Sequence, residues 1–243
     1  MAETLLKVEG LTRYFGGLRA VHLHLEVKAG ELHCLIGPNG AGKSTFFHLL
    51  TGRLKPSAGK VYFRHRDITG WDTFRVARLG MSIKFQVASV FEQLSVLQNL
   101  LTAAEFRYGY REGLGRARHM LDVVGLTQRA EEPASQLSHG EKQWLEIGMA
   151  SIGEPVLLLL DEPTAGMTIS EVHKTVDLLK RLNEQATMIV VEHDMNFIRM
   201  IARQVTVMHE GEVFAQGPME AIEAHEGVRD IYLGKGRHYV IRR

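Results

Sequence analysis

One stretch of the sequence limits the possible fold more than any other. An apolar segment, ELHCLIG (31–37), leads directly into a glycine-rich segment and then into KSTFFHLLTG (43–52). The first segment has the pattern of a buried strand, and the last has the pattern of a helix that stops at Gly52. Between them, GPNGAGKS (37–44) matches the spacing G-x-x-x-x-G-K-[ST] in full. Strand, glycine loop and helix in this order predict a phosphate-binding loop in an α/β fold.

The residues of this loop have separate expected roles. Backbone N–H groups surround phosphate oxygens, the Lys43 ammonium reaches the β- and γ-phosphates, and the Ser44 hydroxyl binds Mg²⁺. Mg²⁺ and a nucleotide with β- and γ-phosphates are therefore the expected ligands. A glycine-rich turn without a ligand is disfavoured, because every required residue and both flanking elements are present. The predicted nucleotide-binding residues of the loop are Gly37, Pro38, Asn39, Gly40, Ala41, Gly42, Lys43, Ser44 and Thr45.

Composition limits the class of protein. The chain has 243 residues, of which 45% are hydrophobic and 23% charged, as in ordinary globular proteins. A net charge of +1 disfavours a nucleic-acid partner. The longest aliphatic run, VLLLL (156–160), is far shorter than the ~20 residues that cross a bilayer. With no visible secretory signal and the single cysteine Cys34, a cytoplasmic location is expected.

The remaining pattern predicts a core with an insertion. Residues 1–86 and 137–243 are expected to form an ATP-binding α/β core, with a parallel sheet and an N-terminal antiparallel β subdomain. Residues 87–136 carry apolar residues at helical spacing and predict an inserted α-helical subdomain. The segment VTVMHEGEVFAQG (205–217) predicts a hairpin around Glu210 and Gly211.

Polar residues follow three further apolar strands. Asp161 and Glu162 end VLLLLDE, Gln86 ends MSIKFQ, and His193 ends TMIVVEH. Because the carboxyl ends of parallel strands share one edge of a sheet, we expect these side chains to meet the phosphate loop there. Asp161 would hold Mg²⁺ through water, and Glu162 would polarise an attacking water. Taken singly, each could also be an ordinary polar strand end.

A second anion-binding helix start lies at LSHGEKQ (137–143). Ser138 followed by Glu141 has the spacing of a capping box, and a helix N-terminus attracts anions. With the phosphate loop, Gln86, the Asp-Glu pair and His193 in this order, the chain resembles the ATP-binding subunits of ABC transporters over nearly its whole length. The resemblance implies a head-to-tail dimer, in which the LSHGE segment of one subunit closes over ATP bound by the other.

The resemblance also assigns site residues. It implies catalytic roles for Glu162, His193 and Gln86, and Mg²⁺ binding by Ser44, Gln86 and Asp161. Residues expected to contact the partner's ATP are Ser138, His139, Gly140 and Glu141. Phe15, in TRYFGG (12–17), would stack on adenine, with a core aromatic as the alternative. The sequence departs from the family pattern at His139, Glu141 and Thr168, where Gly, Gln and Asp are usual.

The resemblance implies partners and cargo as well. The chain would act as a motor subunit docked peripherally on the inner face of the membrane, on two transmembrane permease subunits, and would work indirectly with a substrate-binding protein. Val90, Phe91 and Leu94 are candidates for docking or for the core. The segments AGMT (165–168) and IYLG (231–234) resemble the branched-chain amino acid and urea importer group, with the urea type preferred. A soluble ABC-type ATPase, an exporter ATPase and a small-molecule kinase are the alternatives.

Overall fold

The computed structural model describes residues 3–85 and 90–233. Their contacts divide the chain into two compact units: unit 1 comprises Met1–Thr73 and His193–Arg243, and unit 2 comprises Phe74–Glu192. This division differs from the predicted core and insertion, because the helices within 87–136 pack against α5 (His139–Ser151) in the same unit. The predicted domain boundaries stay a prediction.

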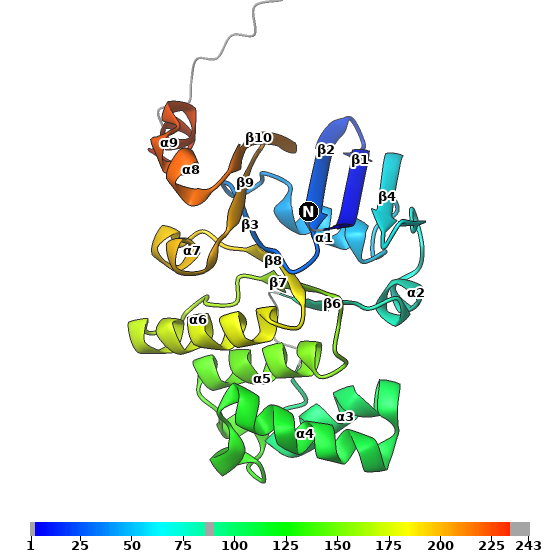
Figure 1. Cartoon of the computed structure of the whole chain (residues 1–243), viewed down its shortest axis with the longest axis vertical. Helices are drawn as coiled ribbons and strands as arrows, with labels where there is room; N and C mark the ends of the chain where they lie inside the picture. Colours follow the sequence, from blue (N-terminus) through cyan, green and yellow to red (C-terminus); the bar gives the residue numbers. More distant parts are fainter. Residues whose placement is uncertain (1–2, 86–89, 234–243) are drawn as a thin grey trace, which may run out of the picture. The chain divides into compact units, whose positions relative to one another are not determined.

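Unit 1 contains the predicted antiparallel sheet. Its strands are β1 (Thr4–Phe15), β2 (Leu18–Lys28), β4 (Ala58–Phe63) and β5 (Arg66–Asp67), in the order β2-β1-β4-β5 (Figure 1). Val8 on the central strand pairs with Leu25 on one side and Val61 on the other. All three side chains are buried, so one face of the sheet forms part of the core.

A second group of strands in unit 1 carries the phosphate loop. These are β3 (Leu32–Ile36), β9 (Gln204–His209) and β10 (Glu212–Gly217), with β3 parallel to β9 and β10 antiparallel to it. The predicted hairpin is confirmed, and Glu210 and Gly211 have φ values of 49° and 80°, as a tight hairpin turn requires. The helices of this unit are α1 (Lys43–Leu50), α7 (Met195–Ile201), α8 (Met219–Ala224) and α9 (Glu226–Leu233).

Three parallel strands form the framework of unit 2. They are β6 (Met81–Lys84), β7 (Leu157–Asp161) and β8 (Thr187–Val191), in the order β6-β7-β8. Every residue of β7 and β8 is buried. The continuous apolar runs read from the sequence are therefore strands covered on both faces, as in parallel sheets generally. Their carboxyl ends lie at one edge, where Lys84 pairs with Leu160 and Asp161 pairs with Val191.

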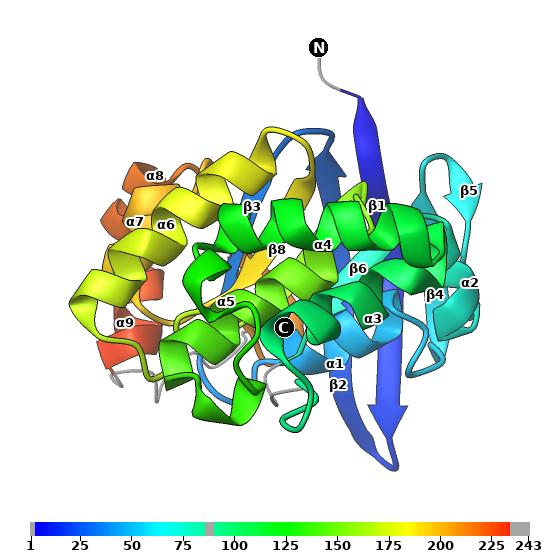
Figure 2. The same ribbon diagram turned by 90° about the horizontal axis from the view of Figure 1, so that it is seen from below.

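The helices of unit 2 include the predicted helical segment. They are α2 (Thr73–Arg78, beginning at the division between the units), α3 (Val96–Tyr108), α4 (Tyr110–Val124), α5 and α6 (Ile169–Asn183), with short 3-10 turns at Thr127–Arg129 and Ala134–Gln136. Helices α3, α4 and α5 lie side by side (Figure 2). A Cβ atom on Gly148 would lie only 3.0–3.2 Å from Val124, Leu100 and Met120, so the absent side chain permits this close approach. No helix in the described part of the chain is long and apolar enough to cross a bilayer.

A buried hydrogen bond joins α5 to α6. The Trp144 indole N–H donates to the Thr175 hydroxyl over 2.9 Å, and that hydroxyl donates to the Glu171 carbonyl oxygen over 2.9 Å. Thr175 is fully buried and Trp144 nearly so. The Thr175 hydroxyl therefore accepts the hydrogen bond of an indole N–H that water cannot reach.

We expect Thr175→Val to destabilise the protein by about 1–3 kcal/mol, because it leaves the buried indole N–H without its acceptor at nearly unchanged volume. The measurement is the free energy of unfolding in urea, followed by Trp fluorescence and circular dichroism. Thr175→Ser, which keeps the hydroxyl, is the control for the lost hydrogen bond. Unchanged stability of the Val variant, which keeps the methyl group, together with a loss in the Ser variant would show that methyl packing, and not the hydrogen bond, stabilises this site.

Candidate nucleotide site

The phosphate loop of unit 1 has a backbone that only glycine allows. Gly40 and Gly42 have φ values of 82° and 98°. A Cβ atom on Gly42 would lie 2.6 Å from the Ala20 carbonyl oxygen, and one on Gly37 would lie 2.2 Å from that of Met208. The motif glycines are thus required by the packing of the loop against neighbouring backbone as well as by its turn.

The loop presents positive charge at the start of α1. The Lys43 ammonium donates to the carbonyl oxygens of Gly37 and Pro38 over 2.6 and 3.1 Å. The first turn of α1 contains no acidic side chain, and its N-cap is Gly42. The helix dipole and the ammonium therefore act in the same direction, toward an anion. Ser44 is exposed and Thr45 half-buried, so the chemistry and the placement of these residues fit a nucleotide phosphate.

Phe15 lies at the surface. Its side chain is 44% exposed, at the end of β1, and the Arg13 guanidinium carbon lies 4.9 Å from the ring centroid. The core alternative for Phe15 is therefore wrong. An exposed aromatic ring is what stacking on a base requires, although adenine stacking itself stays a prediction.

In unit 2, the two predicted carboxylates follow β7 directly. Asp161 is its last residue and is 6% exposed. Glu162 has a φ of 47°, which is uncommon for a residue with a side chain and turns the chain sharply away from the strand. Its N–H donates to the Val191 carbonyl oxygen over 2.9 Å. The strand end is thus joined to β8 where the backbone leaves the sheet.

Two charged residues that sequence reasoning missed lie at the same edge. Glu192, only 1% exposed, accepts from both the N–H and the hydroxyl of Thr164, over 3.1 and 2.5 Å, and so fixes the turn after Glu162. Lys84, 3% exposed, donates to the Asp161 carbonyl oxygen over 3.3 Å. In both cases the available signal was a charged residue at the end of an apolar strand.

Lys84 also lies close to an acidic residue of α5. Its Nζ is 3.9 Å from Oε2 of Glu146, which is 3% exposed. Burial lowers the pKa of the Lys84 ammonium, while the neighbouring carboxylates, Glu146 first among them, act in the opposite direction.

The LSHGE segment begins α5 with the predicted capping box. The Ser138 hydroxyl accepts from the Glu141 N–H over 3.2 Å, and the Glu141 carboxylate accepts from the Ser138 N–H over 2.8 Å. The same carboxylate lies 3.2 Å from an Arg129 guanidinium nitrogen. Glu141 is therefore engaged within its own chain. The capping box does not use the first-turn N–H groups of His139 and Gly140.

The residues that depart from the family pattern connect this segment to the turn after β7. The His139 ring nitrogen Nε2 lies 2.8 Å from the Ala165 carbonyl oxygen. Thr168 is the N-cap of α6, in a capping box with Glu171. A Cβ atom on Gly140 would lie 2.3 Å from the Glu171 carboxylate, so a larger residue would displace that side chain where the two helix starts approach each other.

Two predicted residues remain, His193 and Gln86. His193 is exposed, two residues after β8, and belongs to unit 1. The following Asp194 caps α7 by accepting from the N–H groups of Asn196 and Phe197. Gln86 lies outside the described residues. The structure thus brings Asp161 and Glu162 together in unit 2, and the loop residues 37–45 together in unit 1.

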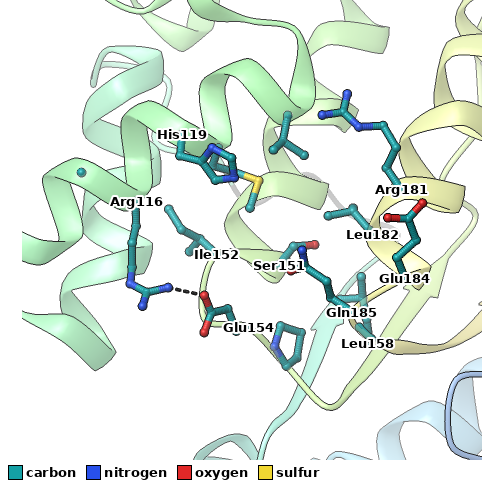
Figure 3. A pocket seen from close by; sticks show the side chains of 15 residues that line it. Arg116, His119, Ser151, Ile152, Glu154, Leu158, Arg181, Leu182, Glu184 and Gln185 are labelled. Carbon is teal, nitrogen blue, oxygen red and sulfur yellow. Dashed lines mark hydrogen bonds and ion pairs between the residues drawn. The ribbon is translucent and has the colours of Figure 1, made fainter.

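A cavity of about 500 Å³ in unit 2 lies away from these residues. It is lined from α4, the end of α5 and the end of α6, with Leu158 near the start of β7 on its floor (Figure 3). Asp161 lies at the opposite end of the same strand. An ion pair between Arg116 and Glu154 closes one side. The cavity contains no residue with a predicted role, so its size does not make it the candidate site.

Comparison with known proteins agrees with this geometry. The family model described as ABC transporter matches residues 21–165. The high-affinity branched-chain amino acid transport ATP-binding protein LivG of Salmonella typhimurium is 35% identical, over 97% of this chain and the whole of that protein. A nucleotide-free ATP-binding cassette from an ABC transporter has a TM-score of 0.87 at 27% identity, over 94% of this chain and 98% of the other.

A further solved structure is a dimer. It is a post-hydrolysis state of an ATP-binding cassette bound to ADP and Pi, with a TM-score of 0.78 at 27% identity, over 88% of this chain and 99% of the other. The predicted fold class is confirmed by these structures, and the predicted family by the family model and the relatives. The chain therefore belongs to the ABC transporter family, as one of its ATP-binding subunits that hydrolyse ATP to drive transport.

Proposed function

We propose that the chain hydrolyses Mg²⁺-bound ATP with Glu162 as the general base. The observation that carries this proposal is the backbone of Glu162, which leaves a buried strand at a φ of 47° directly after Asp161. The two acidic residues are thus consecutive at the edge of a parallel sheet, where ligands bind in such folds. Asp161 would hold the metal ion, and Glu162 would accept a proton from the attacking water.

The residues present suit a magnesium ion. The Ser44 hydroxyl and the Asp161 carboxylate supply the oxygen ligands that Mg²⁺ prefers, and the Gln86 amide oxygen is the proposed third. When bound, the ion neutralises charge on the transferred phosphate. Lys43 holds the β- and γ-phosphates, Glu162 accepts a proton from the attacking water, and His193 contacts the γ-phosphate. Phe15 stacks on adenine.

The start of α5 acts on the ATP of a second subunit. The N–H groups of His139 and Gly140, with the Ser138 hydroxyl, are the proposed donors to the γ-phosphate in trans. Glu141 contributes indirectly, because its carboxylate is held by Ser138 and Arg129 in its own chain. The dimeric structure of a similar cassette supports a dimer, and the two anion-binding helix starts of this chain favour its head-to-tail form.

Two permease subunits and a substrate-binding protein complete the proposed importer, with this chain on the inner face of the membrane. Phe91 is a candidate contact with the permease, since its side chain is 51% exposed while Asn99, fully buried, hydrogen-bonds both its N–H and its carbonyl oxygen. The name of the 35% identical relative favours branched-chain amino acids as cargo over urea or short amides, which reverses the order preferred from the sequence.

Glu162→Gln should reduce ATP turnover on the order of 10²–10⁴-fold, because it removes the base at unchanged shape. ATP affinity should stay near that of the wild type, whereas Lys43→Ala should weaken nucleotide binding itself. Phosphate release and binding of a fluorescent ATP analogue measure the two effects. Near-normal turnover in Glu162→Gln would refute the assignment of the base.

The Glu162→Gln chain should become a dimer with ATP and return to a monomer with ADP, as measured by light scattering. Adding Ser138→Asp should prevent this dimer, because it keeps the helix cap but brings a carboxylate against the partner's phosphates. Ser138→Asn has the same size and capping ability without the charge, so it is the matched control and should still dimerise. A monomer at every ATP concentration would show that identical chains do not close on each other.

A strain lacking this chain should lose uptake of radiolabelled leucine and retain uptake of urea. The wild-type chain should restore leucine uptake. Phe91→Glu should keep the ATPase activity of the isolated chain and fail to restore transport, because a charge replaces an exposed apolar contact. Loss of urea uptake alone would show that urea, and not leucine, is the cargo. Restored leucine uptake by Phe91→Glu would show that Phe91 does not contact the permease.

A further inference from the structure

The peptide unit between Asp161 and Glu162 is held at both of its polar ends. Its N–H, on Glu162, donates to the Val191 carbonyl oxygen of β8 over 2.9 Å. Its carbonyl oxygen, on Asp161, accepts from the Lys84 ammonium of β6 over 3.3 Å. The plane of this peptide is thus defined by the strands on both sides of β7.

The orientation of that peptide determines the direction of the Glu162 side chain. Glu162 has a φ of 47°, a conformation that side chains disfavour and that persists only when surrounding contacts impose it. Rotation of the peptide plane would change φ and with it the path of the backbone that carries the Glu162 carboxylate. The two hydrogen bonds oppose this rotation, and only the one from Lys84 comes from a side chain.

Lys84 is in turn connected to α5. Its ammonium lies 3.9 Å from the Glu146 carboxylate, and both side chains are almost completely buried. Glu146 lies on the helix whose N-cap is Ser138, eight residues earlier. A buried pair at this distance contributes little to stability, because desolvation offsets much of the attraction. A single ammonium therefore links the end of β6, the strand end that carries Glu162, and the LSHGE helix.

We propose that Lys84 is a positioning residue for Glu162: by holding the Asp161 carbonyl oxygen it fixes the peptide that aims the Glu162 carboxylate at the attacking water. The inference rests on the proposed role of Glu162 as the base. Lys84 does not touch the reacting atoms. Its effect passes through one peptide plane, and its contact with Glu146 extends that effect to the helix that acts on the partner's ATP.

The test separates positioning from stability. Lys84→Met alone leaves Glu146 buried without its cation, so the informative variant is Lys84→Met combined with Glu146→Gln, which removes both charges at similar volume. Its melting temperature and ATP affinity should stay near those of the wild type, while kcat falls roughly 10- to 100-fold, as expected for a misplaced catalytic group. Glu146→Gln alone, the matched control, should keep a kcat close to that of the wild type.

A double-mutant cycle then identifies the route of the effect. In the Glu162→Gln background, adding Lys84→Met and Glu146→Gln should reduce kcat by no more than about twofold, because the group that Lys84 positions is already lost. Wild-type kcat in the folded Lys84→Met, Glu146→Gln chain would overturn the proposal, as would equal losses in both backgrounds. If Glu162→Gln itself turns over normally, the base assignment fails and the positioning role falls with it. If kcat falls in Glu162→Gln but not in the Lys84→Met, Glu146→Gln chain, the positioning role alone is refuted.

Discussion

The hydrogen bond from the buried Lys84 ammonium to the Asp161 carbonyl oxygen imposes a constraint on the whole of unit 2. An ammonium can be kept in an apolar sheet only if acceptors and opposite charges surround it. Asp161 and Glu146 supply them, from β7 and α5. The helix that begins with LSHGE therefore packs against β6 and β7, whose ends carry Lys84 and Asp161. The strand end that carries the proposed base and the helix proposed to contact a partner's ATP are thus linked through one ammonium.

Unit 1 satisfies a different constraint, which is steric. Its phosphate loop approaches neighbouring backbone so closely that Gly37 and Gly42 have no room for a Cβ atom. The loop then exposes N–H groups at the start of α1, where the helix dipole and Lys43 favour an anion. Backbone geometry shapes this loop, which is why its motif is rich in glycine.

The departures from the family pattern have structural partners within the chain. His139 reaches the Ala165 carbonyl oxygen, and Thr168 caps α6 beside the start of α5. Glu141 serves its own helix cap and Arg129. These contacts align two helix starts, α5 and α6, and leave Ser138 and Gly140 as the family-like positions. At these motif positions the side chains therefore support the segment from within its own chain.

The sequence by itself determined the phosphate loop, the helix caps, the hairpin and the buried parallel strands, because each of these lies in a contiguous stretch with its own periodicity or spacing. It determined the family through the order of several such motifs along the chain. Only the tertiary structure decided that Phe15 is exposed, that Glu192 fixes Thr164, and that Lys84 reaches Asp161. The physical reason is distance along the chain: Lys84 and Asp161 are 77 residues apart, and Thr164 and Glu192 are 28 apart. Strand pairing and burial bring such residues together, and no local sequence pattern specifies that pairing.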